Sequence, residues 1–151
     1  HYCYHPSLYI VYFSKEQGCS VSSYRLDEGS GTLSPMQIIS TVPEGYHARN
    51  TCSQIQMNAA GSLLYVPNRG HNSICGFAVD SSGWLSSVGQ VATEAVPSAF
   101  SLDTTGNFLF AAGSASDRLA SYRVNQDTGS LSVLDTHEIG KRPMEVLAIS
   151  F

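Results

Sequence analysis

Ionisable and aromatic side chains gather in the segment TVPEGYHARN, residues 41–50, which carries Glu44, Tyr46, His47 and Arg49 close together. The segment is polar, and it separates two stretches that are rich in apolar residues, as a surface loop does. Binding residues concentrate on such loops. His47 and Arg49 are therefore candidates for lining a ligand pocket, and an ordinary solvated loop is the alternative interpretation.

A second group of candidates is Arg69, Gly70 and His71, between the apolar stretches LLYV and SICGFAV. These stretches favour β-strands and the polar residues between them favour a turn, so a hairpin with these residues at its tip is predicted. An arginine can clamp a carboxylate or phosphate through two hydrogen bonds, and a histidine can transfer a proton. The alternatives are structural: Arg69 pairs with a backbone carbonyl or a neighbouring carboxylate, and His71 caps the turn.

General catalytic and metal-binding signatures are absent from the sequence. There is no G-x-S-x-G elbow, no P-loop and no G-x-G-x-x-G segment. The cysteines Cys3, Cys19, Cys52 and Cys75 stand far apart without a C-x-x-C pair, so no metal site is expected. Buried free thiols are favoured over disulfides, and no cofactor is expected.

Charge and hydropathy narrow the classes of partner. A formal charge of −4 with only 13% charged residues argues against nucleic-acid binding, which needs a basic face. No apolar stretch approaches the roughly 20 residues of a membrane span. The first residues, HYCYHPSLYIVYF, lack a basic leader and a Met, so this end does not identify the compartment; a cytoplasmic location is our expectation.

Internal repeats indicate the fold. An aromatic residue recurs at Tyr24, Phe77 and Tyr122, and each is followed by a turn that ends in G-x-L. Four short strands in a repeat of about 45 to 50 residues are typical of a β-propeller blade. We expect one all-β domain over residues 1–151, a partial propeller of three four-stranded antiparallel blades. The predicted blades are approximately 7–57, 61–102 and 106–150, with flanking inner strands at Tyr2–Pro6 and Pro143–Ser150.

The number of blades leaves the ring open. Propellers usually have about four to eight blades, so three blades form an arc with two exposed apolar faces. Either the sequence is a piece of a longer chain, or the arc associates with another copy of itself.

Two long segments resemble a known family. AAGSLLYVPNRGHNSICGFAVD and DTTGNFLFAAGSASDRLASYRVNQDTGSL are similar to the seven-bladed lactonase propellers, the 6-phosphogluconolactonase-like family that includes the fungal carboxymuconate-lactonizing enzymes. The family segment N-R-G-H-D-S-I is seen here at Asn68–Ile74, and the family turn D-x-x-T-G-x-L at Asn125–Leu131. The opening HYCYHP resembles the R-H-x-x-F-H-P inner strand. The resemblance covers essentially the whole chain.

The resemblance implies hydrolysis of a sugar-acid lactone of the 6-phosphogluconolactone type, or interconversion of a muconolactone. The partner is then a small lactone or another acidic ligand. It implies Arg69 and His71 as catalytic candidates. The candidates for substrate binding are His1, His47, Arg49, Gln54 and Gln56.

The chain departs from the family at two inner strands. The family pattern A-E-I-H is here Ser53-Gln54-Ile55-Gln56, and P-R-x-F is Pro97-Ser98-Ala99-Phe100. Glutamine cannot act as a base and serine carries no charge, although lactone opening needs both a base and a group that stabilises the oxyanion. A non-catalytic propeller that binds a small ligand or a protein partner is therefore the alternative. For Gln54, hydrogen bonding within the channel floor is the alternative to ligand contact.

Overall fold

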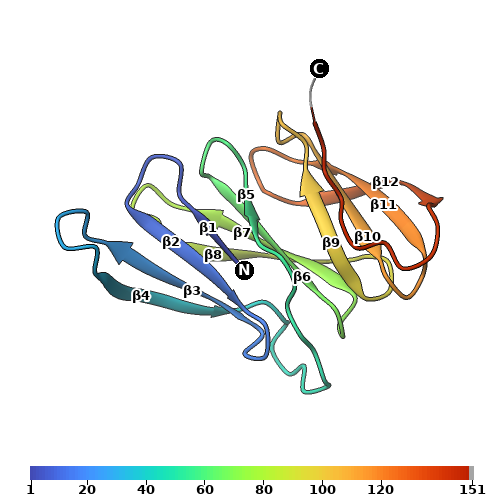
Figure 1. Ribbon diagram of the computed structural model, residues 1–151, viewed down its shortest axis with the longest axis horizontal. Helices are drawn as coiled ribbons and strands as arrows, with labels where there is room; N and C mark the ends of the chain where they lie inside the picture. The colour runs from blue at the N-terminus through green and yellow to red at the C-terminus, as the bar shows by residue number, and fades with distance from the viewer. Residues whose placement is uncertain (150–151) are drawn as a thin grey trace.

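The structure, a computed structural model that describes residues 1–149, contains three four-stranded antiparallel sheets that lie side by side (Figure 1). The first blade comprises β1 (Tyr2–Tyr4), β2 (Ile10–Lys15), β3 (Ser20–Leu26) and β4 (Leu33–Ser40). The second comprises β5 (Gln56–Met57), β6 (Leu63–Asn68), β7 (Ser73–Val79) and β8 (Leu85–Ala92). The third comprises β9 (Pro97–Leu102), β10 (Phe108–Gly113), β11 (Arg118–Val124) and β12 (Leu131–Glu138). The strands of each sheet pair in chain order, which confirms the predicted all-β partial propeller.

The same turn joins the third and fourth strands of every blade. Its glycine has a positive φ, 70° at Gly31, 84° at Gly83 and 74° at Gly129, a backbone conformation that glycine adopts without strain. Each of these glycine N–H groups donates to the carbonyl of an aspartate or asparagine earlier in the turn, at 2.7–2.9 Å. The repeated G-x-L pattern is therefore a requirement of turn geometry.

The outermost strand of each blade carries an irregularity at an equivalent position. The register of β4, β8 and β12 shifts opposite Ser23/Tyr24, Gly76/Phe77 and Ser121/Tyr122. Such a bulge increases the local twist of an edge strand and makes the edge less able to pair with another chain.

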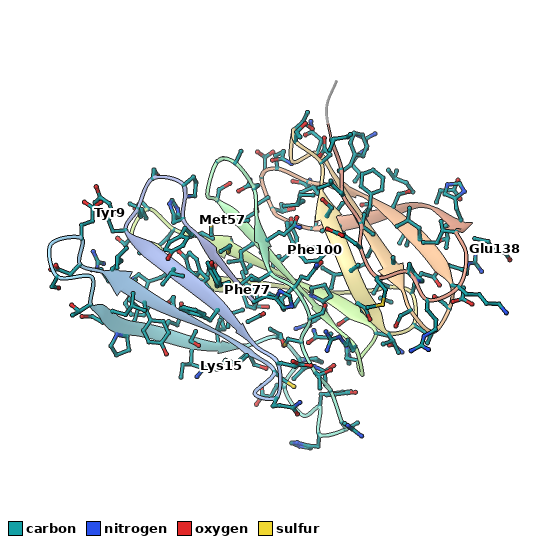
Figure 2. The ribbon with its side chains drawn as sticks, in the orientation of Figure 1. Tyr9, Lys15, Met57, Phe77, Phe100 and Glu138 are labelled. Carbon is teal, nitrogen blue, oxygen red and sulfur yellow. The ribbon has the colours of Figure 1, made fainter. Side chains whose placement is uncertain are left out.

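The hydrophobic core lies between the sheets (Figure 2). Tyr12 and Phe77 belong to the cluster between the first and second blades, and Tyr65 and Phe100 to the cluster between the second and third. A four-stranded sheet one layer thick cannot bury both of its faces by itself. Each blade is therefore stabilised by burial against its neighbour.

Trp84 marks the contact between the first two blades. Its indole is 46% exposed, and its backbone N–H donates to Asp80 Oδ1 at 3.0 Å. The next residue, Leu85, exchanges two hydrogen bonds of 2.9 Å with the side-chain amide of Gln37 in β4. Gln37 thus connects the outer strand of the first blade to the start of β8.

Each inner strand belongs to one sheet with the three strands that follow it, whereas the predicted units 7–57, 61–102 and 106–150 grouped it with the three strands that precede it. The sheets span residues 2–40, 56–92 and 97–138. Short turns explain this grouping, because Asn58 and Asp103 accept N–H groups that bring β5 onto β6 and β9 onto β10. A repeating sequence does not show where one blade ends and the next begins. The hydrogen bonds between strands define those boundaries.

The prediction of an inner strand at Pro143–Ser150 is wrong for residues 143–149, which form no strand. Residue 150 lies outside the described residues. In the three sheets, the partner of the inner strand is the strand that follows it in sequence. The segment lies along β9, where Ala148 N–H donates to Ser101 Oγ at 3.3 Å.

The first blade turns an aromatic surface away from the second. By their register, Tyr2, Tyr4, Phe13 and Tyr24 lie on one face of the sheet, and neighbouring rings are 5.7–5.9 Å apart. Tyr2 is 61% exposed. The four residues form the open face of the first blade.

Within residues 1–149 there is no helix that is long and apolar enough to span a membrane.

Candidate functional site

The three hairpins between second and third strands lie at the same end of the blades, and the linkers between blades cross that end. At each tip a residue other than glycine has a positive φ: 45° at Cys19, 52° at Asn72 and 58° at Asp117. Their carbonyls accept N–H groups from the linkers that follow, from Thr41, Thr93 and Ile139, at 2.9–3.2 Å. Each linker is therefore fixed to the tip of the preceding blade.

The side chains at these tips reinforce the contact. Asn72 Oδ1 accepts the N–H of Val96 at 2.9 Å, and Asp117 Oδ1 accepts that of Arg142 at 2.7 Å. Asparagine and aspartate tolerate the left-handed conformation better than other residues with side chains. At the first tip, Cys19 Sγ is 3.3 Å from both the carbonyl oxygen and Nδ2 of Asn50.

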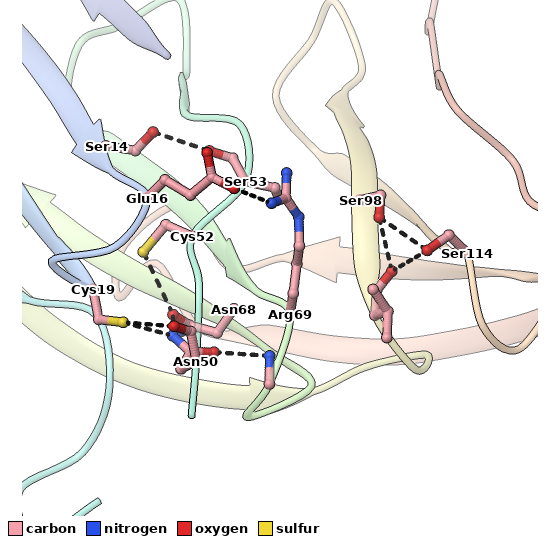
Figure 3. Close-up of polar contacts among 12 residues, drawn as sticks. Ser14, Glu16, Cys19, Asn50, Cys52, Ser53, Asn68, Arg69, Ser98 and Ser114 are labelled. Carbon is pink, nitrogen blue, oxygen red and sulfur yellow. Dashed lines mark hydrogen bonds and ion pairs between the residues drawn. The ribbon is translucent and has the colours of Figure 1, made fainter. Parts of the chain in front are cut away.

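Asn50 and Asn68 form a buried network behind the second tip (Figure 3). Asn50 Nδ2 donates to Asn68 Oδ1 at 2.9 Å. The same oxygen accepts the hydroxyl of Thr41 at 2.8 Å, and Asn68 Nδ2 donates to the Thr41 carbonyl at 2.8 Å. Because all these groups are removed from water, the network fixes the position of the long linker relative to β6.

The tip itself is held by Asn50. Asn50 Oδ1 accepts the backbone N–H groups of Gly70 and His71 at 2.9 and 3.0 Å. A Cβ at Gly70 would overlap the carbonyl oxygen of Arg49 and approach Asn50 Cα to 2.8 Å. Glycine is therefore required for the tip and the linker to pack this closely, and the packing brings Arg49 next to Arg69.

Arg49 and Arg69 line one pocket of about 350 Å³, together with Asn50, Thr51, Gly70 and Val96. Arg69 Nη1 is 2.7 Å from Glu16 Oε1, an ion pair drawn in Figure 3. The Arg69 side chain is 27% exposed, so its guanidinium is still accessible to a ligand. Two arginines among the residues that line the pocket, with one of them paired to Glu16, give it a net positive charge, which suits an anionic ligand.

None of the predicted histidines lines this pocket. His71 packs edge-on against Tyr46 with ring centroids 4.7 Å apart, and its Nδ1 is 2.8 Å from Ser73 Oγ. His47 is exposed on the linker. His1 is exposed just before β1, and its carbonyl accepts Ser14 N–H at 3.0 Å. The structure therefore brings Arg49 and Arg69 to one pocket, and no imidazole lines it.

Gln54 and Gln56 bond to the backbone of β9. Gln54 Oε1 accepts the N–H of Phe100 at 3.0 Å, and Gln56 Oε1 accepts that of Leu102 at 2.9 Å. Gln56 Nε2 also donates to the Phe100 carbonyl at 3.2 Å. The two side chains therefore form hydrogen bonds with backbone groups of β9 that do not pair with β10.

The serines of the inner strands are also bonded to the protein. Ser53 Oγ donates to the Pro97 carbonyl at 3.0 Å, and Ser14 Oγ donates to the Ser53 carbonyl at 2.9 Å. Ser98, where the resemblance places an arginine, lies 3.0 Å from Ser114 Oγ. The Ser14 and Ser53 hydroxyls connect neighbouring blades, whereas Ser98 and Ser114 lie in the same blade.

The cysteines are free thiols, as expected. Burial raises the pKa of Cys52 to about 11, and it raises the pKa of Cys3 and of Cys75 to about 12. These three thiols therefore stay protonated and do not act as nucleophiles. In the part of the chain that the structure describes, no three His, Cys, Asp or Glu side chains are grouped to hold a metal ion.

The sequence did not single out Glu16, Asn50 or Asn68 as functional residues. Asn68 belongs to the N-R-G-H segment, so the motif contained a signal for it. Glu16 and Asn50 have no such signal, because their roles arise only when three segments meet at one end of the blades.

Comparison with known proteins identifies the family. The model of the family "Lactonase, 7-bladed beta-propeller" matches residues 1–148. The chain is 32% identical over 151 residues to a 6-phosphogluconolactonase of Pectobacterium carotovorum, covering 99% of this chain and 46% of that protein. It is 33% identical over 147 residues to a 6-phosphogluconolactonase of Yersinia pestis, covering 97% and 44%.

Solved structures agree. A protein from Lactobacillus plantarum superposes with a TM-score of 0.92 at 28% identity, covering 96% of this chain and 43% of that one. The periplasmic gluconolactonase of Pseudomonas aeruginosa superposes with a TM-score of 0.86 at 26% identity, covering 93% and 40%. The chain thus spans less than half the length of the relatives that it matches, and it belongs to the seven-bladed β-propeller lactonase family.

Proposed function

We propose that this chain contributes the anion-binding part of a propeller that hydrolyses a sugar-acid lactone of the 6-phosphogluconolactone type. The observation that carries the proposal is the pocket in which Arg49 and Arg69 lie together. A phosphate or carboxylate on the substrate would bind between the two guanidinium groups, and Arg69 would exchange its contact with Glu16 for the ligand. A muconolactone, which carries carboxylates, has the same complementary chemistry.

Water activation requires a base, and none of the six residues that line the pocket is one. We propose the imidazoles of His47 and His71 as the proton-transfer groups, because His47 lies on the same linker as Arg49 and His71 directly follows Gly70, with His1 as a further contact to substrate. His71 is the better positioned, since Tyr46 and Ser73 fix the orientation of its ring. Gln54 and Gln56 would contact substrate only if they gave up their bonds to β9.

The experiment compares the wild-type chain with Arg69→Ala on 6-phosphogluconolactone and on a muconolactone, with spontaneous hydrolysis subtracted. We expect hydrolysis above the spontaneous rate and at least about a tenfold loss in Arg69→Ala, because a charge-assisted contact contributes roughly 1.5 to 3 kcal/mol. Arg25→Ala is the matched control, because Arg25 lies in β3 at the opposite end from the tips. Equal rates for Arg69→Ala and Arg25→Ala would contradict the role of Arg69.

The second candidate is a non-catalytic propeller that binds an acidic ligand. It is favoured by Gln54 and Gln56, which stand where the family has an acid and a histidine and are bonded to the backbone of β9. Calorimetry with 6-phosphogluconate separates the two candidates. Binding that is weakened in Arg69→Ala, without turnover of either lactone, would establish this second function.

We further propose a cytoplasmic location, in which a phosphorylated sugar lactone would be available. Covering the two apolar ends of the arc requires either the remainder of a longer chain or a second copy. We propose the remainder of a longer chain, since the relatives are more than twice as long.

A further inference from the structure

The linker between the second and third blades carries a valine in an unfavourable backbone conformation. Val96 has a φ of 55°, in the left-handed region where a β-branched side chain is strained. It also precedes Pro97, and the residue before a proline favours extended backbone. Glycine would adopt this conformation without strain. A valine at this position therefore lowers stability, and its side chain must provide the compensating gain.

Both backbone polar groups of Val96 are bonded within the protein. Its N–H donates to Asn72 Oδ1 at 2.9 Å, at the tip of the second blade. Its carbonyl accepts the N–H of Ser114 at 3.0 Å and the hydroxyls of Ser98 and Ser114, each at 3.2 Å, from the third blade. These bonds hold the left-handed conformation from both sides, and a glycine would form them equally well. The isopropyl group is what distinguishes valine here.

The isopropyl group is not part of the hydrophobic core. Val96 belongs to neither core cluster and is partly exposed. It lines the pocket of about 350 Å³ that also contains Arg49 and Arg69, called the arginine pocket below. Of the six described residues that line this pocket, it alone has a purely hydrocarbon side chain. Because its backbone groups are engaged elsewhere, Val96 offers a ligand an apolar surface in the same pocket as two cations.

The next linker shows that its geometry does not require a valine. Arg142 stands at the equivalent position, three residues after the N–H that bonds to the hairpin tip, and it also precedes a proline, Pro143. Its φ is 53°, and its N–H donates to Asp117 Oδ1 at 2.7 Å, as Val96 donates to Asn72. Arg142 is exposed and does not line the arginine pocket. The same backbone arrangement thus carries two different side chains, and only the valine meets the pocket.

We propose that Val96 determines the specificity of the arginine pocket. The two arginines bind a phosphate or carboxylate group, and the isopropyl group packs against the carbon atom that carries it. The pocket therefore selects an organic anion, such as the CH₂–O–phosphate end of a phosphorylated sugar acid, over free inorganic phosphate, which has no carbon to contact. This proposal rests on the anion-binding function proposed above and adds the residue that distinguishes substrate from free phosphate.

The binding test is an NMR titration of the chain with 6-phosphogluconate and with inorganic phosphate, since this method measures weak as well as tight binding. We expect Val96→Gly to weaken the affinity for 6-phosphogluconate about fivefold and to leave the affinity for phosphate within about twofold, because only the organic ligand loses an apolar contact. Val96→Ile keeps a branched aliphatic side chain and should retain both affinities. Arg142→Gly is the matched control in about 0.15 M salt, which screens distant charges, and it should alter neither affinity.

The backbone strain provides a second measurement that needs no ligand. We expect the urea midpoint of Val96→Gly to equal or exceed that of the wild type, because glycine relieves the left-handed conformation, although glycine in place of a larger residue ordinarily lowers stability. A clearly lower midpoint for Val96→Gly would show that the side chain serves the fold, and it would overturn the proposal.

Two binding results would also overturn it. An equal loss of both affinities in Val96→Gly would mean that the altered linker had displaced the arginines, and an unchanged affinity for 6-phosphogluconate would mean that the isopropyl group makes no contact. If both ligands bind and are weakened by Arg69→Ala while Val96→Gly matches the wild type, this proposal fails and the proposed anion-binding function stands. Binding of neither ligand by the wild type, or binding that Arg69→Ala leaves unchanged, would contradict both.

Discussion

At the scale of single residues, the segment Asn68-Arg69-Gly70-His71 combines four separate requirements. Asn68 closes a buried amide network, and Gly70 allows the linker to approach the tip. Arg69 carries the charge of the pocket, and His71 packs against Tyr46 on the linker. Asn68 and Gly70 therefore fix the shape of the tip, and only Arg69 and His71 are proposed to act on a ligand, which explains why a motif match alone does not establish an activity.

Replacing Asn68 tests whether its buried hydrogen bonds stabilise the fold. We expect Asn68→Ala to lower the free energy of unfolding by about 3 kcal/mol, because the buried Thr41 carbonyl and Asn50 amide lose their shorter hydrogen bonds and keep only contacts of 3.4 Å with Gln90 and 3.3 Å with Cys19. Urea unfolding followed by circular dichroism measures the change. Asn107→Ala is the control, since Asn107 is exposed. A loss below about 1 kcal/mol would mean that water replaces the missing amide.

The sequence singled out two arginines that line the pocket, but it did not single out the residues that position them. Arg69 and Arg49 were identified from residue type and from their place on a tip and a loop. Their neighbours were not, because Glu16, Arg69 and Asn50 come from three segments whose separation depends on how two blades pack. Gln54 and Gln56 illustrate the opposite case, because their polar character indicated a ligand but their amides are used to complete a strand edge.

At the scale of strands and turns, a blade is joined to the next both near the axis and farther out. Gln54, Gln56 and Ser53 bond to the next inner strand, while Tyr12 and Tyr65 bond to the next outer turn. Two separated rows of hydrogen bonds fix the angle between sheets more firmly than apolar packing alone, which is not directional.

The contribution of the hydrogen bonds between the tyrosines and the outer turns to stability can be measured at Tyr65. We expect Tyr65→Phe to lower the free energy of unfolding by about 1 to 2 kcal/mol, since the ring still fills its site but the buried Gly129 carbonyl loses its donor. Tyr2→Phe, at an exposed tyrosine, is the control. Equal stabilities for the two variants in chemical denaturation would show that the hydroxyl contributes nothing.

Strands were predictable here because the repeat shows the same pattern three times. The tip predicted at Arg69, Gly70 and His71 lies between the end of β6 at Asn68 and the start of β7 at Ser73. The prediction of the inner strands was less accurate. Residues 143–149 have an apolar pattern that suits a strand, yet a strand needs a partner for its backbone, and no pattern within a segment can reveal whether that partner is present.

At the scale of the whole molecule, the blades are mutually dependent because the core lies between them. The turn that joins β1 and β2 adds a contact across the first two blades. His5 Nδ1 accepts Leu8 N–H at 3.0 Å within the turn, and its ring bonds to the backbone of Gly61 in the second blade. A Cβ at Gly61 would lie 2.6 Å from this ring, so the two turns are in direct contact.

This contact makes stability depend on pH in a defined direction. Burial lowers the pKa of His5 below 6.5, and the Gly61 hydrogen bond opposes the change only in part. The unfolded chain therefore binds a proton at His5 before the folded chain does, so folding is favoured above pH 6.5 and loses this contribution as the pH falls through the lowered pKa.

We expect the stability difference between the wild type and His5→Gln to shrink as the pH is lowered from about 7.5 to about 5, because glutamine does not titrate. Denaturant midpoints measured across this range test the prediction. His47→Gln serves as the matched control at an exposed position. A difference that stays constant, or that grows on acidification, would contradict the assignment.

Trp84 is the one tryptophan of the chain, and it adjoins the residue through which Gln37 joins the first two blades. Its fluorescence is therefore an intrinsic probe of the contact between the first and second blades. Separation of the first two sheets would change the emission of the indole, whereas rearrangement at the third sheet would leave the spectrum as it was. Optical spectroscopy can thus follow the opening of one part of the arc without any added dye.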